Sequence, residues 1–100
     1  MYRGTTPVIS LTVTGLSDIE LHSAYLTVKQ RNVIIEKTLD DMTIADDKIE
    51  VTLSQKETLQ FGAGLNAEIQ LRCLSKSDVA YASEVLTVPV DRILKDGEIT

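Results

Sequence analysis

The sequence predicts an all-β protein, an antiparallel β-sandwich of about seven strands with one or two single-turn helices. Short segments in which apolar and polar residues alternate recur along the chain, and polar or glycine-containing turns separate them at intervals of about 8–12 residues. No apolar pattern of helical period extends beyond one or two turns. The 100 residues match the size of one domain, so residues 1–100 are expected to form a single unit.

Composition bounds the class of protein. Apolar residues make up 43% and charged residues 25% of the chain, which is typical of a folded globular protein. The net charge of −5 argues against a nucleic-acid or anionic-membrane partner. No apolar run approaches the roughly 18 residues of a membrane span, and the N-terminal residues lack a signal-peptide pattern. The single cysteine, Cys73, is expected to be a buried thiol made in a reducing compartment.

The first strand is expected over Val8–Val13, where apolar residues alternate with serine and threonine. Gly15 ends this strand. Ser17 and Glu20 then match the S-x-x-E capping pattern, in which the two side chains satisfy free backbone N–H groups. This pattern predicts a single helical turn capped by Ser17.

A hairpin is expected next. Ala24–Gln30 and Val33–Leu39 both alternate, and only Arg31 and Asn32 separate them, which favours antiparallel neighbours. After a break at two aspartates, Met42–Ile44 is a short strand. The first half of the chain is therefore predicted to be a meander.

The stretch from Ile49 onward combines a strand and a helical turn. Ile49–Leu53 alternates, and Ser54 then caps a turn with Glu57 as its reciprocal partner. Leu59 and Phe61 are expected to pack this turn over the open end of the sheets.

The last strands are predicted over Ala67–Leu74 and Ala80–Val90, joined by a polar turn. Pro89 cannot donate to a strand ladder, so it should lie at a sheet edge or a bulge. The strand number and spacing favour the immunoglobulin-like or fibronectin-like type of sandwich.

No predicted site carries chemistry, so the chain is expected not to be an enzyme and to have no catalytic, cofactor-binding or metal-binding residues. Gly62–Ala67 fits G-x-G-x-x-A, but it follows a helical turn and precedes a strand, the reverse of a dinucleotide fingerprint. The glycines are interpreted as a corner that needs positive φ. Four aspartates lack the spacing of a calcium loop and are interpreted as solvated turn residues: Asp40, Asp41, Asp46 and Asp47.

His22 is the only histidine, and Asp18 would lie on the same side of a helical turn. With Ser17 and Ser23 nearby, a nucleophile, base and orienting group can be drawn, although no nucleophile motif surrounds them. A corner histidine with a solvent or backbone partner is the favoured interpretation.

Several stretches together resemble small proteins encoded among the tail and baseplate genes of bacteriophages and prophages of Gram-positive bacteria. The resemblance runs over nearly the whole chain, and its motifs are strands, turns and a capped corner. The stretches are Met1–Pro7, Ala24–Gln30, Val51–Phe61, Ile69–Arg72 and Asp91–Gly97.

The resemblance implies a non-enzymatic building block of a phage tail or baseplate. Its expected partners are other tail or baseplate proteins or further copies of itself, with residues 1–7 and 91–100 as contact arms. The expected localisation is the cytoplasm of the host bacterium during assembly, and afterwards the virion.

A carbohydrate-binding or cell-surface-binding module of a phage tail is the alternative. Sugar platforms usually present exposed aromatic side chains, and here only Tyr2, Tyr25 and Tyr81 are available. Packing of Tyr25 and Tyr81 across neighbouring strands is the favoured interpretation of these two residues.

Overall fold

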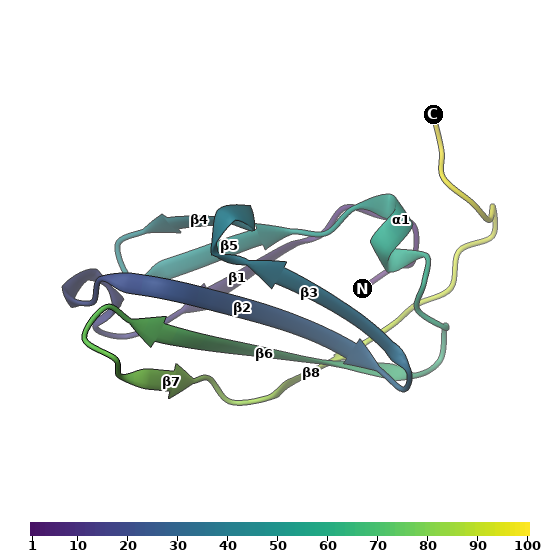
Figure 1. Cartoon of the computed structure of the whole chain (residues 1–100). Coiled ribbons are helices and arrows are strands. Elements are labelled where there is room, and N and C mark those ends of the chain that lie inside the picture. The colour runs from purple at the N-terminus through teal and green to yellow at the C-terminus, as the bar shows by residue number, and fades with distance from the viewer.

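The computed structural model describes residues 1–100 and shows two antiparallel sheets packed face to face (Figure 1). The predicted all-β sandwich is confirmed. The smaller sheet has the strand order β1 (Val8–Thr12), β5 (Lys48–Thr52), β4 (Met42–Ala45). The larger sheet has the order β3 (Val33–Thr38), β2 (Leu21–Gln30), β6 (Asn66–Ser75), and both β7 (Ala80–Ala82) and β8 (Leu86–Pro89) pair with the far side of β6.

The chain changes sheets three times, and each change contains a helical turn: η1 (Leu16–Asp18), η2 (Leu39–Asp41) and α1 (Gln55–Thr58). The predicted hairpin of β2 and β3 is confirmed, with Gln30 opposite Val33. The predicted meander is wrong, because β1 pairs with β5 instead of β2, and β4 pairs with β5 instead of β3. Alternation specifies a strand but not the sheet to which it belongs.

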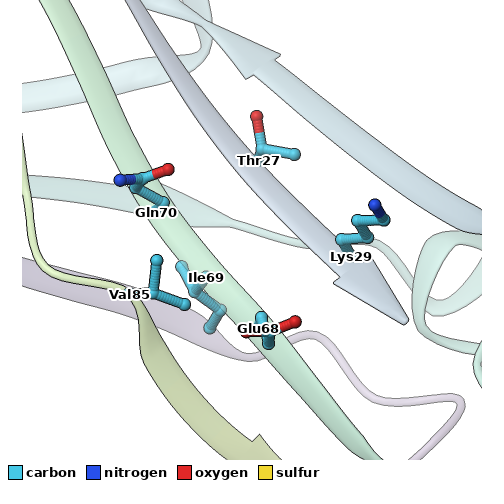
Figure 2. Close-up of a pocket in the computed structure, with 6 residues that line it drawn as sticks. All are labelled: Thr27, Lys29, Glu68, Ile69, Gln70 and Val85. Carbon is cyan, nitrogen blue, oxygen red and sulfur yellow. The ribbon is translucent and has the colours of Figure 1, made fainter. Parts of the chain in front are cut away.

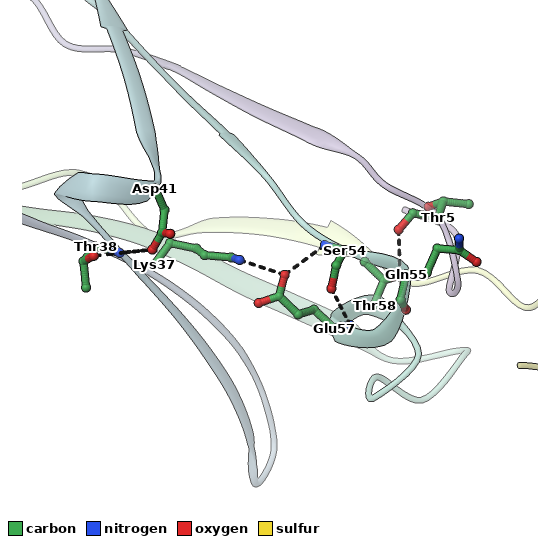
Figure 3. Close-up of polar contacts among 8 residues, drawn as sticks. All are labelled: Thr5, Lys37, Thr38, Asp41, Ser54, Gln55, Glu57 and Thr58. Carbon is green, nitrogen blue, oxygen red and sulfur yellow. Dashed lines mark hydrogen bonds and ion pairs between the residues drawn. The ribbon is translucent and has the colours of Figure 1, made fainter. Parts of the chain in front are cut away.

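The capped turn after β5 is confirmed. The Ser54 hydroxyl accepts the Glu57 N–H at 3.1 Å, and the Glu57 carboxylate accepts the Ser54 N–H at 2.8 Å (Figure 3). The capping box predicted at Ser17 is wrong. η1 instead follows Gly15, which has a φ of 83°, and Ser17 lies inside the turn. The left-handed glycine begins this turn without a capping side chain.

The core lies between the sheets and is aliphatic apart from one aromatic ring. Phe61 is only 1% exposed and closes the end of the sandwich beside α1, as predicted, whereas Leu59 is half-buried. The buried apolar residues are Leu16, Ala24, Leu26, Val28, Ile35, Ile49, Val51, Leu53, Phe61, Ala67, Ile69, Leu71, Cys73 and Val90.

The last predicted strand, Ala80–Val90, is two strands. Between the pairs Arg72↔Ala82 and Ile69↔Leu86, β6 has two residues and the facing chain has three, which defines a β-bulge. Ser83 causes the break, since its hydroxyl accepts the Leu71 N–H at 2.9 Å in place of a backbone carbonyl. Pro89 ends β8 on this edge, as predicted.

Candidate functional site

The corner between α1 and β6 is built around a buried amide that sequence reasoning missed. The Gln30 side chain accepts the Gly62 N–H at 2.7 Å and donates to the Gly62 and Leu65 carbonyls at 2.8 and 3.2 Å. The positive φ expected of the glycines of this corner is confirmed at Gly64, at 82°, and is wrong for Gly62. Because the Gly62 N–H already has a partner, this corner does not present that donor to a phosphate.

Asp18 and His22 are not brought together on a helical turn. Asp18 ends η1, whereas His22 is exposed in β2, and no hydrogen bond or ion pair joins their side chains. Ser17 donates its N–H to the Asp47 carboxylate at 3.0 Å. The spatial arrangement that the sequence suggested for a nucleophile and base is therefore absent.

The aspartates serve turns. The Asp41 carboxylate accepts the Thr38 N–H at 3.0 Å, and the hydrogen bond from Ser17 lowers the pKa of Asp47. No group of three or more histidine, cysteine, aspartate or glutamate side chains is arranged to hold a metal ion. Cys73 is buried, as expected, and burial raises the pKa of its thiol.

The tyrosines do not gather into one platform. Tyr25 lies opposite Arg72 on the outer face of the large sheet and is 44% exposed. Tyr81 lies opposite the inward-facing Cys73, so it belongs to the other face of the same sheet. Tyr2 is far from both in sequence and forms an isolated bridge with Asp91.

A shallow hollow of about 220 Å³ lies on the outer face of β2 and β6 (Figure 2). Lys29 and Glu68 are cross-strand partners there, with Thr27 and Gln70 beside them and Val85 at the margin. Opposite charges on neighbouring strands offset each other. No buried side-chain polar atom of the chain lacks a hydrogen-bond partner. The hollow thus offers mixed polar contacts without a group directed at a ligand.

The N-terminal stretch is fastened to the sandwich. The Arg3 guanidinium donates to the carbonyls of Phe61 and Leu59 at 2.6 and 2.9 Å. The Thr58 hydroxyl, which is fully buried, donates to the Thr5 carbonyl at 2.9 Å (Figure 3). These bonds tie residues 1–7 to α1 and its corner.

The C-terminal stretch leads away from the sandwich and appears in yellow in Figure 1. Leu94 is 92% exposed within it. Near the end, the Ile99 N–H donates to the Gln55 side chain at 2.8 Å. Leu94 is thus an apolar side chain available for contact.

The two sheets have four edges, and these differ in how they are protected against pairing with a strand of another chain. β3 carries Glu36 and Lys37. β4 is four residues long and lies between two pairs of aspartates. The edge formed by β7 and β8 is interrupted by the bulge and ends in Pro89. β1 has none of these features, since Val8–Thr12 contains no charge, proline or bulge.

Backbone groups along one side of β1 have no strand partner. The Leu53 N–H donates to the Pro7 carbonyl at 3.0 Å, and the Val13 N–H donates to the Asp47 carbonyl at 2.7 Å. Backbone N–H and C=O groups alternate in direction along a strand. Those of the odd-numbered residues of β1 therefore point toward β5, and those of Val8, Ser10 and Thr12 point away from it, toward the free edge. The free edge of β1 is the surface of this chain best suited to binding another polypeptide.

Comparisons of the chain with known family models, curated proteins and solved structures found no match in any of the three. None of the helical turns has the length and apolarity needed to cross a membrane.

Proposed function

We propose that this chain is a non-enzymatic structural component of a phage or prophage tail or baseplate, which acts through protein-protein contacts. The observation that carries the proposal is the unprotected, uncharged edge of β1, because such an edge pairs with another chain unless it is covered. The exposed Leu94 on the C-terminal stretch supplies a second apolar contact. The sequence resemblance supplies the biological setting.

The net charge of −5 also bears on the kind of partner. Like-charged copies repel one another, so a contact with a second polypeptide is favoured where this chain is uncharged or where the partner is basic. The proposed localisation is the host cytoplasm during assembly and then the virion.

Size-exclusion chromatography with light scattering tests the function. The purified chain is mixed at micromolar concentration with each protein encoded beside it in the tail gene region. The expected result is a complex of defined stoichiometry with at least one of these proteins. A strict monomer that binds none of them would overturn the proposal.

Quantitative mass spectrometry of purified virions tests the localisation. The chain is expected at a fixed ratio to the other tail proteins. Its absence from virions that contain the complete tail would contradict a place in the virion.

A further inference from the structure

The smaller sheet is narrower than the larger sheet that it covers. The smaller sheet has three strands. The larger sheet has β3, β2 and β6, and in addition the edge formed by β7 and β8 beside β6. Ile35, which faces inward on β3, is only 6% exposed. Tyr81 and Leu86 pair with the inward-facing residues Cys73 and Ile69, yet they are 42% and 41% exposed. The inner side of β7 and of the first residue of β8 is therefore exposed, whereas Val88 farther along β8 packs against the core.

The free edge of β1 borders this uncovered strip. A groove of about 380 Å³ lies between the end of β1 and the bulge, and its lining includes Leu11, Val13, Ser83, Glu84 and Leu86. The outward-facing backbone groups of β1 point toward the position that one further strand of the smaller sheet would occupy. One place thus combines free backbone hydrogen-bonding groups with an apolar floor.

We propose that an extended segment of a different protein binds here as a fourth strand of the smaller sheet, pairing with β1 and covering Tyr81 and Leu86. The inference rests on the proposed function and specifies its contact. Backbone bonds to Val8, Ser10 and Thr12 hold the segment, and its alternate side chains fill the groove.

A second copy of this chain does not fit the position through its own β1. β1 packs on the core of its own molecule through Ile9 and Leu11, and the exposed, inward-facing Tyr81 and Leu86 show that the larger sheet extends beyond β1 on this side. Pairing of two β1 strands, at the usual spacing of about 4.8 Å, would force the two larger sheets into the same space. An extended segment that carries no second sheet packed on it avoids this collision.

The C-terminal stretch of a second copy also lacks the required pattern. Apolar residues must alternate on the inward side, but Lys95, Asp96 and Glu98 interrupt this stretch, and Gly97 has a φ of 84°. A strand from another protein is therefore the better occupant.

Charge defines the chemistry of the occupant. β1 carries no charge, which favours uncharged residues opposite it. Glu84 lines the groove at the Val13 end of β1. A segment antiparallel to β1 has its N-terminal end there. We infer alternating apolar residues preceded by lysine or arginine.

The probe is a nine-residue synthetic peptide of alternating valine and threonine with two lysines at its N-terminus. Amide hydrogen exchange measured by NMR is expected to slow at least tenfold for Ser10 and Thr12 when the peptide binds. The amides of Ile9 and Leu11 already face β5 and should change little. Protection of the edges of β3 or β4 instead would overturn the proposal.

Ser10→Pro is the diagnostic variant, because it removes a donor on the free edge without removing a bond to β5. It should weaken peptide binding at least tenfold, whereas Ser10→Ala, which keeps the N–H, should stay within twofold. Leu86→Asn should also weaken peptide binding, because it replaces an apolar side chain that lines the groove with a polar one. If Ser10→Pro binds the peptide as the natural chain does, the proposal is wrong.

Two altered peptides test the site without changing the protein. N-methylation of alternate peptide residues should abolish binding, and glutamates in place of the lysines should weaken it at least fivefold. Equal binding of the N-methylated peptide would exclude strand pairing.

The inference and the proposed function fail separately. If a tail protein forms a complex that Ser10→Pro leaves intact, the strand position is wrong and the structural role stands. If no tail protein binds, the structural role is wrong, and the peptide measurements alone decide whether β1 accepts a strand.

Discussion

The Nζ atom of Lys37 lies 2.8 Å from Oε1 of Glu57, and this ion pair joins β3 of the larger sheet to α1 (Figure 3). The same oxygen accepts the Ser54 N–H at 2.8 Å. The two charged side chains are only 17% and 22% exposed, so solvent screens them less than an ordinary surface pair. One carboxylate therefore both caps α1 and fixes the turn to the sheet.

A double-mutant cycle with Lys37→Met and Glu57→Gln should give a coupling free energy of about 1 kcal/mol in urea unfolding, at the upper end for ion pairs that keep some solvent contact. Lys76 and Glu20 provide the control pair, 3.9 Å apart with side chains 63% and 83% exposed. Their coupling should be close to zero. Equal coupling for both pairs would show that partial burial of Lys37 and Glu57 has no effect.

The same carboxylate makes stability depend on pH. Partial burial raises the pKa of Glu57, but the Lys37 ammonium and the Ser54 N–H and hydroxyl lower it by more, so its pKa lies below the ordinary value. A lowered pKa in the folded state contributes stability above the unfolded-state pKa, about 4.3 for glutamate, and this contribution is lost as pH falls through the folded-state pKa.

The free energy of unfolding of the natural chain should therefore exceed that of Glu57→Gln at pH 6, and the difference should shrink as pH falls below about 4. Urea unfolding at a series of pH values measures it. Glu36→Gln, at an exposed position of β3 without an ion pair, is the matched control. A difference that stays constant down to pH 2.5 would contradict the assigned role of the Glu57 charge.

The Gln30 amide should be a large contributor to stability for a single polar side chain. It is 4% exposed and forms three hydrogen bonds to the backbone of Gly62 and Leu65. Gln30→Leu leaves the Gly62 N–H and carbonyl without partners, whereas the Leu65 carbonyl keeps the Val90 N–H, and the loss should cost about 2–3 kcal/mol in urea unfolding. Gln60→Leu, at an exposed position, should change stability by less than about 0.5 kcal/mol. Similar small losses for both variants would mean that water replaces the Gln30 amide.

Sequence patterns predicted local features of this fold well. Alternation located β2 and β6, and the S-x-x-E pattern located the capped turn at Ser54, because both depend on residues close together in the chain. The same pattern failed at Ser17, where the left-handed Gly15 begins the turn instead. A short motif lacks the information to choose between these two ways of starting a helical turn.

The features that define the candidate site depend on contacts between distant residues. The sequence of Val8–Thr12 shows a strand, but that β1 lies at an edge follows only from its pairing with β5. The bulge at Ser83 and the bonds of Gln30 to the Gly62 corner likewise join segments far apart in sequence. The absence of charged residues in Val8–Thr12 is visible in the sequence. That this uncharged strand forms an unprotected sheet edge follows only from the strand order.

The packing of α1 against the end of the sandwich leads to the last prediction. Phe61 is 1% exposed within the core, whereas Leu59 is half-buried and lies close to Gly4 of the N-terminal stretch. Phe61→Ala removes a fully buried ring and should lower the free energy of unfolding by about 3–5 kcal/mol. Leu59→Ala removes a side chain that already has solvent contact, so its cost should be near the lower end of the range for buried leucine, about 2 kcal/mol.

Urea unfolding of both variants, monitored by far-ultraviolet circular dichroism, measures the two losses. Phe61→Leu is the control, because it keeps an apolar side chain and should lose less than Phe61→Ala. If Leu59→Ala costs more than Phe61→Ala, the contact of α1 with the N-terminal stretch, rather than the buried ring, closes this end of the sandwich. If both cost less than about 0.5 kcal/mol, the end of the sandwich contributes little to stability and the assigned role of α1 is wrong.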